Sequence, residues 1–384
     1  MTFTILHGKN LDILPTLPDN SVDSIVTDPP YELGFMGKKW DSSGIAYSVQ
    51  LWTECLRVLK PGGHLLSFGG TRTYHRMVVG IEDAGFEVRD MISWISNKTF
   101  PKSHNLKDEW AGWGTGLKPT VEPIVMARKP LIGTVAHNVL THGTGALNID
   151  GSRIGHNEPI KIMKAQNQES KGFGQSIGRS EKTTELSAKG RWPANIILDE
   201  HTAGLLDEQS GHLHGSGNIS DVENDKGKGY ESSGYEVSYN GRANRDFGAK
   251  GGGASRFFYV AKASKRDRNE GLEDLPKKQA AFGGHANNEQ DGMTKQLVHA
   301  PRQNFHPTVK PTALMGYLVK LVTPPNGTVL DPFTGSGSTG KAAILNGFDF
   351  IGIEMTEDYL PIIKARLEHA ETEFAEAQAD KGLF

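Results

Sequence analysis

The segment at 329–342, VLDPFTGSGSTGKA, decides the fold of this chain. It opens with apolar, strand-like residues, continues through a glycine-rich turn and ends in the composition of a helix start. A strand, a glycine loop and a helix in this order place a ligand at the carboxyl end of the strand. The segment therefore predicts an α/β protein with a ligand site at this turn.

The chain on both sides of this segment alternates between strand-like and helix-like patterns, which is typical of a mostly parallel sheet covered by helices. We expect a Rossmann-like α/β fold with a seven-stranded sheet to which both ends of the chain contribute. The expected strands are 2–7, 22–27, 64–68, 87–95, 121–127, 328–330 and 350–354. The expected helices are 47–59, 71–84, 312–321, 338–345 and 357–370.

Residues 131–304 differ from both flanks, because they hold 25 of the 46 glycines and few periodic apolar segments. They predict a large loop-rich insertion that does not continue the sheet. Two apolar islands, 191–198 and 256–260, are candidates to nucleate a small module within it. Residues 1–130 and 305–384 are then the two halves of one domain.

Composition restricts the class of protein. A chain of 384 residues with 36% hydrophobic content can bury a substantial core, and its formal charge of −3 gives no overall field that attracts a polyanion. The single cysteine, Cys55, lies in a helical pattern and excludes an intrachain disulfide. With neither a signal peptide nor an apolar run of membrane-spanning length, the sequence predicts a soluble, cytoplasmic protein.

Three ligands compete for the glycine loop. A nucleoside triphosphate is disfavoured, because Ala342 stands where the P-loop pattern needs a hydroxyl for magnesium. A dinucleotide would fit the three glycines Gly335, Gly337 and Gly340 and the acid Glu354, but this pattern alone is weak.

The third candidate is S-adenosylmethionine, which Asp331 favours. A carboxylate beside the glycine turn would repel a pyrophosphate but attract the cationic amino end of a methionine moiety. Glu354, at the end of the next expected strand, is placed to accept both ribose hydroxyls. Either acid alone is typical of an ordinary strand end, whereas the combination favours the methyl donor.

A second motif, Asp28-Pro29-Pro30-Tyr31, follows the apolar strand expected at 22–27. An exocyclic amino nitrogen is a poor nucleophile because its lone pair is delocalised into the ring. Asp28 and the Pro29 carbonyl can accept both of its hydrogens and return that pair to nitrogen. The prolines fix the backbone, and Tyr31 offers a face for stacking a base flipped out of the duplex. Alone, the motif is equally typical of a strand-ending turn.

Together the two motifs resemble those of the DNA amino methyltransferases, which carry a DPPY-type tetrapeptide and an FxGxG loop, here at 28–31 and 333–337. Their order matches the permuted β group, in which the long insertion is the target-recognition region. The resemblance covers about 1–130 and 305–370. It implies the S-adenosylmethionine-dependent methyltransferase fold, S-adenosylmethionine as cofactor and double-stranded DNA as partner in a bacterial or phage-infected cell; a homodimer stays open.

The resemblance also implies further cofactor contacts. The segment at 306–311 is similar to the family segment that lines the methionine and ribose end of the pocket. Relatives commonly have Gly-Asp near the first strand, where this chain has Gly8-Lys9-Asn10, so Asn10 is only a candidate. The expected cofactor residues are Asn10, His306, Thr308, Lys310, Asp331, Pro332, Phe333, Gly335, Gly337 and Glu354.

Asp28 in the tetrapeptide is similar to the adenine-modifying members, whereas cytosine-N4 members more often carry serine there. Adenine-N6 is therefore favoured, with cytosine-N4 as the alternative. Carbon-5 methylation needs a cysteine nucleophile and is disfavoured. Two further hypotheses are an RNA or protein-amide methyltransferase and a catalytically silent DNA-binding protein.

Basic residues interleaved with the tryptophans Trp110 and Trp113 suit a surface that tracks phosphates, although a solvated charged face is the usual explanation. Loosely spaced histidines, without cysteines, predict no metal site. The candidate DNA contacts are Lys98, Lys102, Lys118, Lys262, Lys265, Arg266 and Arg268.

Overall fold

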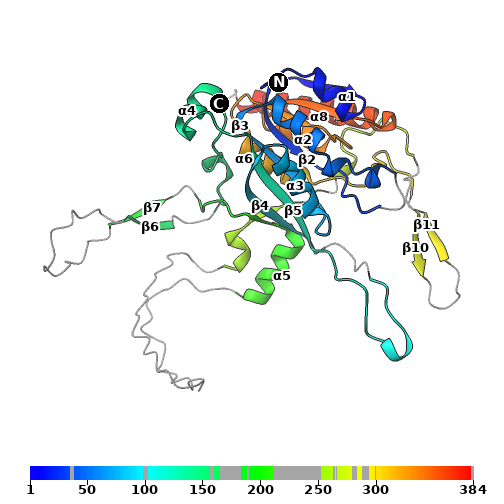
Figure 1. Ribbon diagram of the computed structural model, residues 1–384. Coiled ribbons are helices and arrows are strands. Elements are labelled where there is room, and N and C mark those ends of the chain that lie inside the picture. The colour runs from blue at the N-terminus through cyan, green and yellow to red at the C-terminus, as the bar shows by residue number, and fades with distance from the viewer. Residues whose placement is uncertain are drawn as a thin grey trace, which may run out of the picture.

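The structure is a computed structural model that describes residues 1–34, 39–97, 103–155, 160–164, 183–187, 190–211, 252–262, 264, 266–278, 283–287, 294–298 and 300–381. Its centre is a sheet of nine strands in the order β1-β13-β12-β2-β3-β5-β4-β8-β9 (Figure 1). In that order the strands are Phe3–His7, Asp349–Glu354, Thr328–Asp331, Val22–Thr27, Leu59–Phe68, Val121–Arg128, Glu87–Ile95, Ile196–Asp199 and Tyr259–Ala261.

Both ends of the chain contribute to this sheet, as the sequence predicted. β2 pairs in parallel with β12, with Ile25 opposite Leu330, and β1 pairs in parallel with β13. β5 alone among these strands runs antiparallel to its neighbours β3 and β4. The carboxyl ends of β2, β12 and β13 therefore meet at one edge of the sheet, which we call the carboxyl edge.

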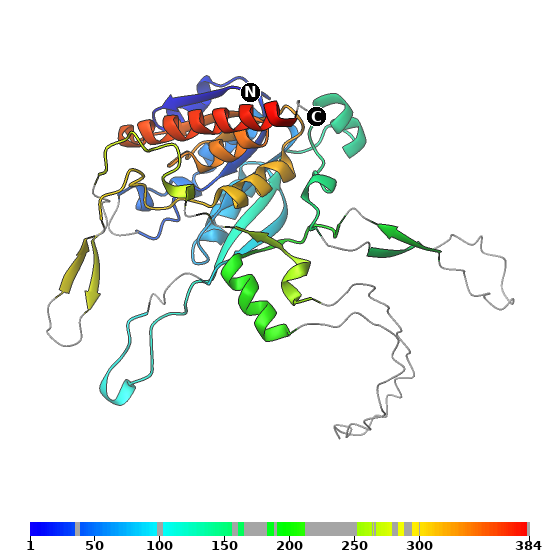
Figure 2. The same ribbon diagram turned by 180° about the vertical axis from the view of Figure 1, so that it is seen from behind.

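Helices cover both faces of the sheet. α2 and α3 lie on the face turned to the viewer in Figure 1, and α6 and α8 lie on the opposite face, seen in Figure 2. The helices are α1 Asn10–Ile13, α2 Val49–Val58, α3 Tyr74–Asp83, α4 Val135–His142, α5 Glu200–Ser210, α6 Thr312–Val322, α7 Ser338–Leu345 and α8 Leu360–Lys381. None of these described helices is long and apolar enough to cross a membrane.

Two hydrophobic cores follow from the two faces. Leu65 packs in the core that also contains Trp52 and Cys55 of α2, whereas its neighbour Leu66 packs in the core under α6 and α7. Successive strand residues point to opposite faces, and each fully buried leucine contributes about 1.5–3 kcal/mol to folding. Cys55 is a buried free thiol whose pKa is raised by burial, as expected for a packed side chain.

The insertion corrects two expectations, since the sheet has nine strands rather than seven and residues within 131–304 do continue it. β8 pairs with β4, with Ser93 opposite Ile196, and β9 pairs with β8, with Ile197 opposite Tyr259. The two apolar islands therefore extend the main sheet instead of nucleating a separate module. The physical reason is that β4 would otherwise expose an edge of unpaired backbone groups.

Two further pairs of short strands from the insertion stand apart from the main sheet. β6 Ile160–Lys164 pairs with β7 Thr183–Ser187, and β10 Gly283–Asn287 pairs with β11 Thr294–Val298, both antiparallel. The described insertion thus supplies strands to the central sheet and hairpin-like extensions around it (Figures 1 and 2).

Candidate active site

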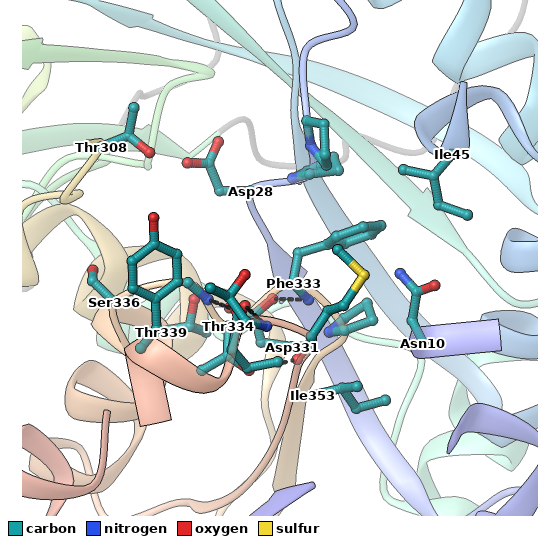
Figure 3. Close-up of a pocket in the computed structure, with 18 of the residues that line it drawn as sticks. Asn10, Asp28, Ile45, Thr308, Asp331, Phe333, Thr334, Ser336, Thr339 and Ile353 are labelled. Atoms are coloured by element: carbon teal, nitrogen blue, oxygen red, sulfur yellow. Dashed lines mark hydrogen bonds between the residues drawn. The ribbon is translucent and has the colours of Figure 1, made fainter. Parts of the chain in front are cut away.

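A cavity of about 610 Å³ opens at the carboxyl edge, and segments from both ends of the chain line it. It contains the whole tetrapeptide Asp28–Tyr31 and the cofactor-loop residues Asp331–Ser336. Figure 3 shows Asp28 and Asn10 on opposite sides of Phe333, so the cavity has two distinct ends. Sites for small molecules commonly have about 300–1,000 Å³. The two motifs therefore line one common cavity.

The cofactor loop is built on the carboxylate of Asp331, the last residue of β12. This buried Oδ1 atom accepts hydrogen bonds from Thr27 Oγ1 at 2.6 Å and from the Phe333 amide at 3.0 Å. Thr334 Oγ1 donates to the Asp331 carbonyl at 3.1 Å, and Figure 3 shows the compact turn that results. Burial raises the pKa of Asp331 to about 6.

Two glycines let this loop approach its neighbours closely. Gly335 has a φ of +55°, and a Cβ there would lie 2.9 Å from His306 Nε2. A Cβ on Gly340 would lie 2.5 Å from the ring of Phe350, which is the close contact between α7 and β13. Glycine is thus required here both for backbone conformation and for packing.

His306 lies over this loop as a neutral side chain. Its Nδ1 is 2.8 Å from the Thr308 carbonyl, and its ring contacts Tyr359 edge-on at a centroid distance of 4.6 Å. Burial lowers the pKa of His306 to about 4. His306, Thr308 and Lys310 all line the cavity.

The loop lysine is not available to a phosphate. Lys341 is buried, and its Nζ pairs with Glu270 Oε2 at 2.7 Å. The buried Arg366 of α8 supports the same loop by donating to the Ser336 carbonyl and, at 2.8 Å, to the Asp267 carbonyl. A P-loop would need its lysine to face the ligand, so the structure excludes the nucleoside triphosphate hypothesis.

Glu354 lies at the end of β13 and lines the same cavity as Asn10, Gly8 and Phe333. Its two carboxylate oxygens accept the Gly335 amide at 2.8 Å and the Thr356 amide at 2.7 Å. Burial raises the pKa of Glu354, while these amides oppose the rise. Each carboxylate oxygen has a second lone pair, so Glu354 retains capacity for hydroxyl groups of a ligand.

Asp28 has one oxygen engaged and one without a partner. Oδ2 accepts a hydrogen bond from Lys310 Nζ at 2.8 Å, whereas Oδ1 is buried and has no partner among the described residues. Burial raises the pKa of Asp28, and the charge of Lys310 opposes that rise. An unsatisfied buried acceptor costs about 1–3 kcal/mol. Such an atom on a residue that lines a cavity is a candidate to bind a donor group of a ligand.

Sequence reasoning missed Glu122, which lies in β5 and lines the cavity beside the tetrapeptide. Tyr31 OH donates to Glu122 Oε2 at 2.8 Å, and Lys310 Nζ lies 3.1 Å from the same oxygen. Burial raises the pKa of Tyr31, which therefore keeps its proton. The available signal was a lone acid in the otherwise apolar stretch 121–127.

The predicted DNA contacts divide into three groups. Lys98, Lys102 and Lys265 lie outside the described residues. Lys118 donates to the Asn97 carbonyl at 2.9 Å and Arg268 to the His306 carbonyl at 2.9 Å, so both hold backbone in place. Lys262 and Arg266 are exposed.

The tryptophans lie on a loop at 103–118 that extends away from the sheet (Figure 1). Trp110 and Trp113 are 55% and 64% exposed and meet edge-on at 5.6 Å. Lys118 lies three residues before the antiparallel β5, and Lys262 directly follows β9, so both lie at the carboxyl edge with the cavity.

A Rossmann-like sheet with this glycine loop and Glu354 at the end of the neighbouring strand suits a dinucleotide as well as S-adenosylmethionine, and the buried carboxylate of Asp331 at the turn favours the class of S-adenosylmethionine-dependent methyltransferases. Residues 22–365 match the DNA methylase family of N6 and N4 methyltransferases, and the chain belongs to this family. The resemblance to the DNA amino methyltransferases is therefore confirmed, and with the family comes S-adenosylmethionine as the cofactor.

Individual relatives differ in how much of the chain they match. The Type II methyltransferase M.HindIII of Haemophilus influenzae is 30% identical over 149 residues, which cover 33% of this chain and 48% of the relative. M.SfiI of Streptomyces fimbriatus is 21% identical over 421 aligned residues, which cover 93% of this chain and 89% of M.SfiI. The DNA adenine methyltransferase YhdJ of Escherichia coli is 43% identical to this chain over 74 residues, which cover 19% of this chain and 25% of YhdJ.

Among solved structures, the cytosine-N4-specific PvuII DNA methyltransferase has a TM-score of 0.47 and 13% identity. That likeness covers 95% of this chain and 86% of PvuII. The chain spans about half the length of M.HindIII, at 48%.

Proposed function

We propose that this protein transfers a methyl group from S-adenosylmethionine to the N6 amino group of an adenine flipped out of double-stranded DNA. One observation carries the proposal: Asp28, whose buried Oδ1 has no partner among the described residues, lines the same cavity as the cofactor loop Asp331–Ser336. A carboxylate with an unused acceptor atom thus belongs to the wall of the cavity in which the methyl donor is proposed to bind.

The cofactor end of the cavity suits a cationic, ribose-bearing ligand. Asp331 offers its carboxylate to the amino group of the methionine moiety, and Glu354 accepts ribose hydroxyls. Phe333 and Asn10 line the space beside them. When bound, S-adenosylmethionine supplies an electrophilic methyl group on sulfur. The full proposed set is Asn10, His306, Thr308, Lys310, Asp331, Pro332, Phe333, Gly335, Gly337 and Glu354.

The target end performs the activation of the amino group. Asp28 Oδ1 and the Pro29 carbonyl accept its two hydrogens, which returns the lone pair to nitrogen for attack on the methyl group. The methylated nitrogen then gives up one proton, and Asp28 is the carboxylate in hydrogen-bond contact with it. Pro30 fixes the turn, and Tyr31 stacks on the flipped base.

Two observations favour adenine over cytosine. The tetrapeptide begins with Asp28, the residue typical of adenine-modifying relatives. A relative that is 43% identical over 74 residues is named a DNA adenine methyltransferase. Cytosine-N4 transfer remains the second candidate, because it uses the same pair of acceptors on the same kind of amino group.

DNA is proposed to approach the carboxyl edge, where Lys262 and Arg266 are exposed. The inserted residues 131–304 are proposed as the target-recognition region between the catalytic halves 1–130 and 305–384. β8 and β9 support this division, because they anchor the insertion to β4 beside the cavity edge.

The test is transfer of isotopically labelled methyl groups to duplex DNA, single-stranded DNA and RNA, followed by digestion and mass spectrometry of the nucleosides. N6-methyladenine from the duplex is the expected product. N4-methylcytosine would correct the base, and transfer only to RNA or protein would replace the substrate class. DNA binding without any transfer would indicate a catalytically silent DNA-binding protein.

A further inference from the structure

Lys310 forms a buried polar cluster at the target end of the cavity. Its Nζ lies 2.8 Å from Asp28 Oδ2, 3.0 Å from Tyr31 OH and 3.1 Å from Glu122 Oε2. The side chain is 9% exposed, and Nζ is 4.7 Å from the centroid of the Phe68 ring. An ammonium group has three donors, so these three oxygens occupy all of its hydrogen-bonding capacity.

The members of this cluster come from separate parts of the fold. Asp28 and Tyr31 follow β2, Glu122 belongs to β5, and Lys310 precedes α6. Tyr31 OH also donates to Glu122 at 2.8 Å, which closes the cluster. Asp28 Oδ1 is a buried atom of this cluster that has no partner among the described residues.

We propose that Lys310 and Glu122 are positioning residues for Asp28. Lys310 holds Oδ2 and supplies the positive charge that keeps the carboxylate ionised, so Oδ1 alone faces the target amino group as an acceptor. Glu122 competes for the same ammonium and limits how much of its charge acts on Asp28. This inference rests on the proposed function, and it assigns Lys310 to the target end rather than to the methionine end of the cavity.

The electrostatics give the two residues opposite effects. Burial raises the pKa of Asp28, Lys310 lowers it and Glu122 raises it. If Asp28 were protonated, one of its oxygens would be a hydrogen-bond donor. The carboxyl group could then not accept hydrogen bonds from both Lys310 and the target amino group. Asp331 on β12 also interacts with Asp28, and His306 beside Lys310 is neutral with a pKa of about 4. Removing Lys310 must therefore raise the pKa of Asp28, whereas removing the charge of Glu122 must lower it.

The experiment is the pH dependence of kcat for methyl transfer to duplex DNA, at saturating cofactor, in the wild type and in Lys310→Met, Lys310→Arg and Glu122→Gln. Ionised Asp28 is required, so the acid limb of the profile follows its pKa. In Lys310→Met the acid limb should move up by about one unit or more, and in Glu122→Gln it should move down. Lys310→Arg keeps the charge and should restore most of the wild-type profile.

A second measurement does not depend on activity. The carboxyl carbon of Asp28 in the protein without cofactor is titrated by ¹³C NMR, with its signal assigned from Asp28→Asn. The same opposite shifts are expected. Should Lys310→Met fail to fold, the downward shift in Glu122→Gln alone supports the proposal.

The outcomes separate the two levels of inference. The role of Lys310 and Glu122 is overturned if the pH profiles and titrations do not shift, or if both variants shift them in the same direction. In that case methyl transfer by the wild type still supports the proposed function. Absence of transfer by the wild type overturns the proposed function, and the NMR titration still decides whether the cluster controls Asp28.

Discussion

The loops that follow β2 and β12 begin alike, but they differ in whether the acid at their start has a carboxylate oxygen without a hydrogen-bond partner. Each starts with an acid at or just after the end of a parallel strand, and the strands are neighbours. Asp331 Oδ1 accepts bonds from Thr27 and Phe333, whereas Asp28 Oδ1 has no partner among the described residues. The first carboxylate holds its own loop, whereas the second leaves a buried acceptor atom without a partner.

This difference teaches how to tell a scaffold acid from a reactive one. The two loops are physically joined, because Thr27 Oγ1 donates to Asp331 at 2.6 Å and Asp28 is the next residue in the chain. A free buried acceptor costs about 1–3 kcal/mol, which a fold tolerates where a ligand restores the bond. Removal of Asp28 and removal of Asp331 should therefore affect two different steps, methyl transfer and cofactor binding.

The largest effect is expected for Asp28→Ala. The variant loses the acceptor for the target amino group, so methyl transfer should fall by about 10²- to 10³-fold, as for removal of a group that acts in the transition state. Cofactor affinity, measured by calorimetry, should stay close to that of the wild type. Retention of substantial transfer would end the distinction between the two loops.

Asp331→Ala should instead weaken cofactor binding by about 10- to 100-fold, since it removes charged hydrogen bonds that hold the loop and the proposed partner of the methionine amino group. Asp331→Asn is the matched control, because its amide oxygen can still accept from the Phe333 amide. If Asp331→Ala affected only transfer and Asp28→Ala only cofactor binding, the assigned roles would be reversed.

Cofactor affinity should also depend on pH, with a change centred where Asp331 titrates, at about 6. The ionised carboxylate attracts the cationic amino group, so affinity should rise by up to about tenfold between about pH 5 and about pH 7. Asp331→Asn should flatten this dependence. An identical pH profile in the variant would assign the titration to another group, such as Glu354, whose pKa is also raised.

The same carboxyl has a predictable effect on stability. Its pKa in the folded chain, about 6, is above the ordinary value of 3.8. Between these values the folded chain binds more protons than the unfolded chain, so this group's contribution to the free energy of unfolding falls as pH rises. The free energy of unfolding of Asp331→Asn, measured by thermal unfolding at several pH values, should lack this fall.

The smallest effects concern the edge around the two loops. Lys262→Ala and Arg266→Ala should each reduce the dependence of log K for DNA on log salt by about 0.9, with a modest loss of affinity. Arg89→Ala is the matched control, since Arg89 is exposed near the start of β4, at the opposite edge of the sheet. Equal slopes for all three variants would show that DNA does not approach the carboxyl edge.

Local patterns account for the parts of the fold that could be predicted. The strand at 22–27 and the helix at 338–345 have the bounds expected from apolar periodicity and from the glycine turn. Both motifs were expected at strand ends, and their common cavity follows from the parallel arrangement of β2 and β12. The place of β8 and β9 was not predictable, because an apolar island carries no information about which sheet edge it will cover.

The sequence by itself determined the class of the fold, the cofactor loop and the tetrapeptide, because each depends on residues adjacent in the chain. Only the tertiary structure decided which acid keeps an oxygen without a partner and which groups surround that acid. Lys310 and Asp28 are 282 residues apart, and Tyr31 and Glu122 are 91 apart. Burial and hydrogen-bond partners depend on which distant segments meet, and no local pattern of residues records that.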